Sequence, residues 1–217
     1  KEKLDWLRRY LKLERGIPCH DTFGRVFAAI DPDEFSAAFL RWVGQVVPAL
    51  SREEVVAIDG KTSRRSGKAG ATPLHLVSAF AAQAGVVLGQ RATAAKSNEK
   101  TAIPELLTTL ALEGCLVTID AMGTQPNIAQ AIRDRGADYV LAVKDNQPTL
   151  AGSIRDFVSA FDAAPERTPH RFHQVVEKDH GRLEGRRCHV FDQLDCLHAP
   201  ERWPDLKSFA MITSERT

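Results

Sequence analysis

Several signals that would assign a function directly are missing from this 217-residue sequence. It contains no glycine-rich phosphate loop, which argues against nucleotide hydrolysis, and no Gly-x-Ser-x-Gly elbow of a serine hydrolase. The four cysteines show no Cys-x-x-Cys spacing, and no apolar segment has the pattern of a signal peptide or a membrane span. We therefore expect a cytoplasmic protein with reduced cysteines.

The composition is that of an ordinary globular protein, with 43% hydrophobic and 26% charged residues. A chain of this length can bury a full core and is expected to form one large domain with an appendage. The formal net charge of +1 neither requires nor excludes nucleic acid, because the clustering of basic residues decides such binding. A zinc site at Cys188, His189, Cys196 and His198 is a weak alternative, since their spacing is irregular.

The first part of the chain, residues 1–50, has a helical pattern. In the stretch "DPDEFSAAFLRWV", Asp31 is placed as an N-cap, Pro32 as the first helical residue and Glu34 as the third. These residues predict a small helical N-terminal segment.

In residues 51–163 the apolar residues no longer recur with the helical period and instead form short runs. Three consecutive strands followed by alternating helices and strands predict a mixed α/β sheet of the ribonuclease-H-like type. The expected strands are 55–59, 74–82, 86–94, one ending at Asp120, and 138–143; the expected helices lie near 104–113, 125–135 and 148–161. Residues 164–217 predict a β-rich region with strands at 171–178, 186–192 and 207–213.

Two acidic residues each follow an apolar run in the same way. Asp59 lies in "VVAIDGKTSRRS", and Asp120 lies in "CLVTIDAMGTQ". Asp-Gly is a common way to leave a strand, so Asp59 alone has a plain alternative as a turn residue. Two carboxylates presented alike at strand ends favour a shared site. The histidines share no spacing with these acids and are more typical of structural or exposed positions.

Three stretches carry a resemblance to a known family: "AIDGKTSRRS", "TIDAMGTQPNIAQAIRDRGADYVLAVKDNQPTL" and "HGRLEGRRCHV". Together they resemble the bacterial insertion-sequence transposases of the DDE type, specifically the group that includes the H-repeat-associated proteins. "IPCHDTFGRVFAAIDPDEF" is similar to the helical segment that precedes the catalytic domain in that group. The resemblance extends over almost the whole chain.

The resemblance implies a metal-dependent DNA strand-transfer reaction. In such enzymes two aspartates and a glutamate hold two Mg²⁺ (or Mn²⁺) ions during in-line attack on a phosphodiester. Asp59 and Asp120 match the first two acids and would be metal ligands. Double-stranded DNA, at the ends of the insertion sequence and at the target, would be the partner, and a homodimer is expected because two DNA ends call for two active sites.

Basic residues lie beside both acids. Lys61, Arg64, Arg65 and Lys68 follow the first acid, and Lys144 follows the strand at 138–143. We interpret them as contacts to the phosphates that flank a scissile bond. The alternative for the run at 61–68 is a solvated loop.

The third acid is where the sequence departs from the family pattern. In that group the glutamate lies on a late helix with a tryptophan upstream and an asparagine directly after it, and this sequence has no such stretch. The chain is therefore expected to be a fragment. Glu184 is the available substitute, with Arg182, Arg186 and Arg187 nearby to reach DNA, although it equally fits an ion-paired residue on a strand.

Other functions remain open at this stage. A product without the third acid would still fold and bind DNA, so a non-catalytic DNA-binding transposase remnant is the main alternative. A hydrolytic nuclease of the same fold is weaker. An aspartate-nucleophile phosphotransferase is weaker still, because Lys61 occupies the place where its second acid would stand.

Overall fold

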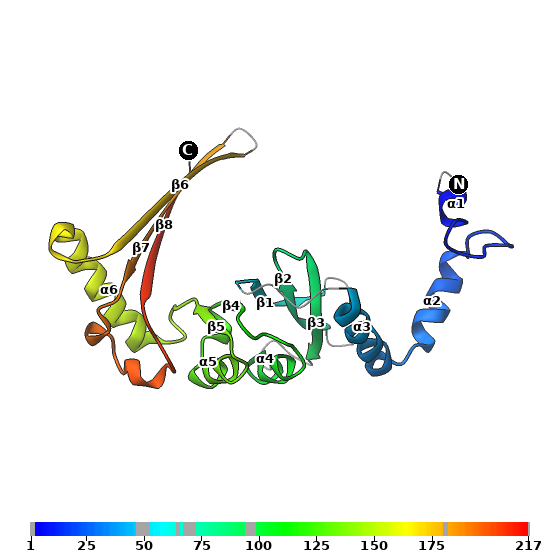
Figure 1. The fold of residues 1–217 in the computed structure, drawn as a ribbon, viewed down its shortest axis with the longest axis horizontal. Helices are drawn as coiled ribbons and strands as arrows, with labels where there is room; N and C mark the ends of the chain where they lie inside the picture. The colour runs from blue at the N-terminus through cyan, green and yellow to red at the C-terminus, as the bar shows by residue number, and fades with distance from the viewer. Residues whose placement is uncertain are drawn as a thin grey trace. The chain divides into compact units, whose positions relative to one another are not determined.

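A computed structural model describes residues 3–46, 53–63, 66, 73–93, 99–179 and 182–216. The chain forms two compact units, Lys1–Pro48 and Ala49–Thr217 (Figure 1). In the described part of the chain, no helix combines the length and the apolar character needed to cross a membrane. The predicted division into three domains at residues 50 and 163 stays a prediction.

The first unit is helical, as its sequence predicted. It contains α1 (Leu4–Leu7), α2 (His20–Ala29) and α3 (Pro32–Val46). The carboxylate of Asp31 accepts hydrogen bonds from the backbone amides of Asp33 at 2.9 Å and Glu34 at 3.0 Å. These bonds satisfy amide groups that have no partner within the first helical turn. The predicted N-cap is therefore confirmed.

The second unit contains a five-stranded sheet in the order β3-β2-β1-β4-β5. β1 pairs antiparallel with β2, and β2 antiparallel with β3, whereas β4 runs parallel to both β1 and β5. This strand order and these directions confirm the predicted ribonuclease-H-like sheet. The strands are β1 (Val55–Thr62), β2 (His75–Ala81), β3 (Val86–Thr93), β4 (Leu116–Ile119) and β5 (Asp138–Leu141).

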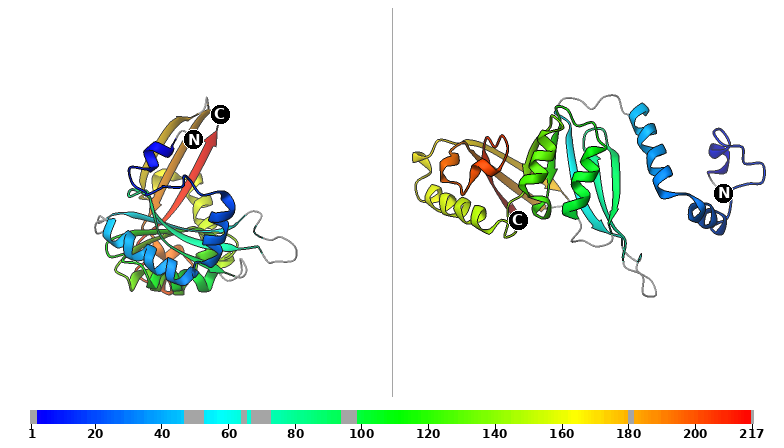
Figure 2. Two further views of the ribbon diagram at one scale, coloured as in Figure 1. Left: turned by 90° about the vertical axis from the view of Figure 1, so that its right-hand side faces the viewer. Right: turned by 90° about the horizontal axis from the view of Figure 1, so that it is seen from below.

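One face of this sheet is buried under two helices, α4 (Glu99–Thr108) and α5 (Pro126–Arg133) (Figure 2). Side chains alternate between the two faces of a strand, so every second residue of an apolar run enters the core. The buried face of the two central strands is formed by Val56, Ile58, Val117 and Ile119. The helices contribute the buried Ile103, Leu106, Leu107, Ile128 and Ile132.

The position of α4 corrects the predicted helix at 104–113. The helix begins at Glu99 and ends at Thr108, with Pro104 inside it. The hydroxyls of Thr108 and Thr109 donate hydrogen bonds to the carbonyls three residues earlier, at 2.7 and 2.8 Å. Proline favours the first turn of a helix, which placed the predicted start too late. The threonine side chains compete with the helical backbone pattern where the helix ends.

A second, three-stranded antiparallel sheet follows in the order β6-β7-β8, as the predicted β-rich region required. Its strands are β6 (Arg171–Asp179), β7 (Arg182–Phe191) and β8 (Phe209–Arg216), and the helix α6 (Pro148–Ala163) precedes it (Figure 1). Aromatic rings join the helix to the sheet, with centroid separations of 4.9 to 5.3 Å among Phe157, Phe161, Phe191 and Phe209.

The segment between β7 and β8 returns to the edge of the first sheet. Its short turns η4 (Leu194–Cys196) and η5 (Pro200–Arg202) flank the buried Leu197 and precede the buried Trp203. Both residues pack in one apolar cluster with Ala129 of α5 and Leu150 of α6. Tyr139 of β5 donates a hydrogen bond of 2.8 Å to the carbonyl of Pro204. This cluster attaches the three-stranded sheet to the β5 side of the first sheet. The remaining turns are η2 (Ala121–Gly123) and η3 (Pro165–Arg167).

Candidate active site

Asp59 and Asp120 lie next to each other where the pairing of two adjacent strands, β1 and β4, ends. Asp120 directly follows β4, whereas β1 continues past the predicted end at residue 59 to Thr62, because Asp59 to Thr62 still pair with β2. β1 and β4 are parallel, and their last paired residues are Ile58 and Ile119, each of which directly precedes one of the acids. Because both isoleucines point into the core, the alternation of the strands turns both carboxylates toward the opposite face. The adjacency that the sequence predicted is therefore present.

The backbone around Asp120 is held by hydrogen bonds. Its carboxylate accepts from the amide of Met122 at 3.0 Å and caps the turn η2. The hydroxyl of the fully buried Thr124 donates to the carbonyl of Ala142, beyond β5, at 2.7 Å. The side chain of Gln147 donates in turn to the carbonyl of Thr124 at 3.0 Å. These bonds connect the loop after β4 to the loop after β5.

Asp59 is paired with a cation in the structure. The ammonium group of Lys61 lies 3.3 Å from the Asp59 carboxylate, and the two side chains are 84% and 53% exposed. Residues two apart on a strand share one face, which is why this pair forms. Solvent weakens an ion pair between such exposed groups, so this pair contributes little to stability.

A cavity of about 1070 Å³ adjoins the two acids. Asp59, Asp120 and Lys144 line it together, which places Lys144 at the same end of the sheet as the acids, as predicted. Its apolar wall includes Trp203 and Ile212 from the second half of the unit. The cavity therefore offers carboxylates and cations beside a surface large enough for an extended ligand.

Arg155 of α6 also lines this cavity, and the sequence interpretation missed it. Its Nε donates to the carbonyl of Ala151 at 3.1 Å, and its guanidinium lies 3.7 Å from Asp145. Its side chain remains 64% exposed. The sequence offered one signal that could have pointed to this residue: Arg155 is the one basic residue among the sixteen residues of α6.

Glu184 lies in the three-stranded sheet and does not line the cavity. Its carboxylate is 3.1 Å from Arg186 and 3.2 Å from Arg216. Burial alone would raise the pKa of Glu184, but hydrogen bonds from Arg216 and Arg186 and their charges lower it. This is the ion-paired strand residue that the sequence left open as the alternative. The role of Glu184 as third acid stays a prediction, and the geometry offers no support for it.

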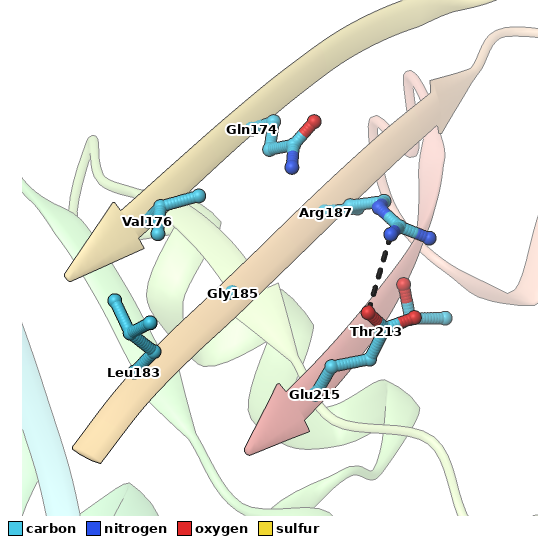
Figure 3. Close-up of a pocket in the computed structure, with 7 residues that line it drawn as sticks. All are labelled: Gln174, Val176, Leu183, Gly185, Arg187, Thr213 and Glu215. Atoms are coloured by element: carbon cyan, nitrogen blue, oxygen red, sulfur yellow. Dashed lines mark hydrogen bonds and ion pairs between the residues drawn. The ribbon is translucent and has the colours of Figure 1, made fainter. Parts of the chain in front are cut away.

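Two of the arginines of the second sheet that were predicted to reach DNA, Arg186 and Arg187, are engaged in ion pairs. Arg186 also lies 3.3 Å from Glu177, and Arg187 donates to Glu215 at 3.2 Å. Figure 3 shows the latter pair at a hollow of about 230 Å³ on this sheet, with Gly185 between the flanking side chains. Opposite charges offset each other there. The backbone of Arg182 belongs to β7, and Arg64, Arg65 and Lys68 lie outside the described residues.

Two carboxylates are too few for a complete metal centre. Among the described residues, no group of three or more histidine, cysteine, aspartate or glutamate side chains is placed to hold an ion. The oxygens of Asp59 and Asp120 nevertheless suit a hard cation such as Mg²⁺. The chain thus supplies two oxygen ligands side by side, and further ligands would have to come from water, substrate or other protein groups.

Comparisons with known proteins identify the family of the chain. The family model described as "DDE_Tnp_1-associated" matches residues 1–43, and the one described as "Transposase DDE domain" matches residues 50–216. A solved cryo-EM structure of the piggyBac transposase synaptic complex with hairpin DNA has 10% sequence identity and a TM-score of 0.36, covering 63% of this chain and 30% of that chain.

Two curated relatives span nearly the whole chain. "Uncharacterized protein in dhlA 3'region" of Xanthobacter autotrophicus is 44% identical over 218 residues, which cover 100% of this chain and 72% of that protein. "H repeat-associated putative transposase YhhI" of Escherichia coli (strain K12) is 39% identical over 222 residues, covering 99% of this chain but 57% of that protein. The chain therefore belongs to the Transposase DDE domain family, within which it resembles the H-repeat-associated group.

Proposed function

We propose that the whole protein is a DDE-type transposase that cuts and joins DNA strands with Mg²⁺ or Mn²⁺, and that Asp59 and Asp120 are two of its metal ligands. The observation that carries this proposal is the placement of the two acids on neighbouring parallel strands, beside a cavity that Lys144 and Arg155 also line. Membership of the transposase family supports the same reaction class. The bound ions would activate the attacking hydroxyl or water and stabilise the leaving oxygen.

The residues of the chain have separate tasks in this proposal. Asp59 and Asp120 supply anionic oxygens from two neighbouring interior strands, and the bonds around Thr124 fix the backbone that presents Asp120. Lys61 neutralises Asp59 until a metal ion replaces it. Lys144 and Arg155 are at the cavity and suit contacts to DNA phosphates, which give affinity without reading sequence.

Double-stranded DNA is the proposed partner, and two copies of the whole protein would act on the two ends of an insertion sequence. Because strand transfer joins two ends, a closed dimer supplies one active site for each. Cations beside the acids are what a phosphodiester substrate requires, since each DNA strand carries one negative charge per nucleotide.

A second function has its own support for the chain considered alone. The cavity holds two acids, while Glu184 is bound by two arginines on another sheet. A 217-residue chain with this arrangement would bind DNA without cutting it. In that case the chain acts as a DNA-binding remnant or regulator of the same DNA ends.

A nicking assay on supercoiled plasmid tests both proposals. The complete gene product should nick the plasmid with Mg²⁺ or Mn²⁺, and Asp59→Asn or Asp120→Asn should each abolish nicking. Asp134→Asn is the matched control, because Asp134 is an exposed acid at the end of α5 that bonds Gln130 outside the cavity. The 217-residue chain should show background activity only. Unchanged nicking by the Asp59→Asn and Asp120→Asn variants would refute the transposase assignment of these residues.

A further inference from the structure

A hydrogen-bonded chain of three polar residues, Thr62, His75 and Glu99, connects the end of β1 to α4, and its last two members are buried on the core side of β1. His75 and Glu99 are 2% and 4% exposed, and the imidazole Nε2 is hydrogen-bonded to the Glu99 carboxylate. The other ring nitrogen, Nδ1, is 3.0 Å from the hydroxyl of Thr62. His75 therefore bridges the last residue of β1 and the first residue of α4.

This chain of residues lies directly under the residue that follows Asp59. A Cβ atom added to Gly60 would be 2.3 Å from the Glu99 carboxylate oxygen and 2.9 Å from His75 Nε2. Neighbouring strand residues point to opposite faces, so the buried pair supports β1 from the face opposite to the Asp59 carboxylate. A larger side chain at position 60 would force the Glu99 carboxylate and the His75 ring to move.

The end of β1 needs further support because only one neighbouring strand, β2, pairs with it beyond Ile58. Its pairing with β4 ends at Ile58, while its pairing with β2 continues from Asp59 opposite Ser78 to Thr62 opposite His75. The strand end that carries Asp59 is thus hydrogen-bonded along one edge only. Gly60 contributes no side chain to hold it, and glycine is the most flexible residue in a strand.

Stability alone does not account for a buried imidazole and carboxylate. Removing such groups from water is costly, and well-packed apolar residues in their place are often as stable or more so. Hydrogen bonds depend on the direction of the donor and the acceptor, so they fix the orientation of the groups that they join. A single imidazole with a partner on each nitrogen fixes the Thr62 end of β1 relative to the start of α4.

We propose that His75 and Glu99 are positioning residues that hold the Gly60 end of β1 and thereby keep the Asp59 carboxylate in place beside Asp120. This inference rests on the proposed function of the two aspartates. It assigns no contact with metal or DNA to either residue, because both side chains are buried on the core side of the sheet.

The test replaces the polar pair with apolar residues in the 217-residue chain, as the double variant His75→Phe, Glu99→Leu. We expect an unchanged or higher melting temperature, faster amide hydrogen exchange at residues 59–62 by NMR, and Mn²⁺ binding weakened by about 10-fold or more. Glu99→Gln retains the size and one hydrogen bond, so it should restore most of the Mn²⁺ affinity. If the double variant does not fold, Glu99→Leu alone takes its place, because it removes the hydrogen bond that links His75 to the start of α4.

Two results separate this inference from the proposed function. If Asp59→Asn in the otherwise unchanged chain leaves Mn²⁺ binding intact, the metal-ligand proposal fails, while the hydrogen-exchange comparison still decides whether the pair holds the strand end. If the double variant, or Glu99→Leu in its place, folds and shows native exchange at residues 59–62, His75 and Glu99 are not positioning residues. Native Mn²⁺ affinity in the folded double variant would overturn the inference equally.

Discussion

The hydroxyl of Thr124 donates a hydrogen bond of 2.7 Å to the carbonyl of Ala142, and it does so from a fully buried position. This bond joins the loop that carries Asp120 to the loop that leads to Lys144. The two loops belong to neighbouring parallel strands, β4 and β5, and both contribute to the cavity. A change at Thr124 therefore affects the geometry of an acid and of a cation together.

Thr124→Val should destabilise the protein by about 1 kcal/mol, because it removes the hydrogen bond between the Thr124 hydroxyl and the carbonyl of Ala142. Urea unfolding followed by circular dichroism measures the loss. Thr213→Val is the control, since Thr213 is exposed on β8 and should change the free energy of unfolding little. Equal effects of the two substitutions would show that the Thr124 bond does not hold the loops.

Lys61→Met should strengthen Mn²⁺ binding by the 217-residue chain a few-fold. The lysine lies 3.3 Å from Asp59 and competes with the metal for its carboxylate, and an exposed pair of this kind is worth at most about 1 kcal/mol. Isothermal titration at low salt measures the change. Lys207→Met, at an exposed lysine outside the cavity, should leave the affinity unchanged. Weaker binding by the Lys61 variant would contradict the competition.

Lys144→Gln and Arg155→Gln should each weaken duplex DNA binding uniformly across sequences. Each lost phosphate contact should reduce the slope of log affinity against log salt by about 1, because one fewer counterion is released. Fluorescence anisotropy at several salt concentrations gives the slope. Arg167→Gln is the matched control, as Arg167 is an exposed cation in η3 outside the cavity. A slope that does not change in either variant would remove these residues from the DNA-binding surface.

The stability of the second unit should fall as the pH falls through about 6.5. Burial, the neighbouring His170 and the charge of Arg187 lower the pKa of His189, while Asp162 opposes them. The unfolded chain therefore binds a proton at a pH where folded His189 does not, so acid favours unfolding. The buried Nδ1 of His189 has no hydrogen-bond partner in the described part of the structure, which agrees with a neutral ring.

His189→Phe should reduce this pH dependence, because an uncharged ring replaces the imidazole among Phe161, Phe172 and Phe191. Melting temperatures between about pH 8 and about pH 5.5 cover the titration of a histidine. His173→Gln, at an exposed position on β6, should retain the parent profile. If acidification lowers the melting temperature of the His189 variant as much as that of the parent, a group other than His189 causes the pH dependence.

Local patterns in the sequence were sufficient to predict most of the elements. The cap at Asp31, the helix that begins at Pro148, the strand that begins at Val55 and the strand that ends before Asp120 all depend on residues within a few positions of one another. Backbone preferences and apolar periodicity act over that distance, so they can be recognised along the chain. The start of α4 was placed wrongly because Pro104, a typical first-turn residue, is tolerated inside this helix.

The sequence alone determined the two acids, the apolar strands that carry them and the family to which they point. Only the tertiary structure decided that Glu99 and His75 meet beneath Gly60, that Arg155 joins the cavity and that Glu184 is held by Arg216 on another sheet. His75 and Glu99 are 24 positions apart in the sequence, and Arg155 is nearly 100 positions from Asp59. The contact between Glu184 and Arg216 depends on the register of β7 and β8. No local propensity encodes them, since they arise when apolar faces are buried and strands pair across the fold.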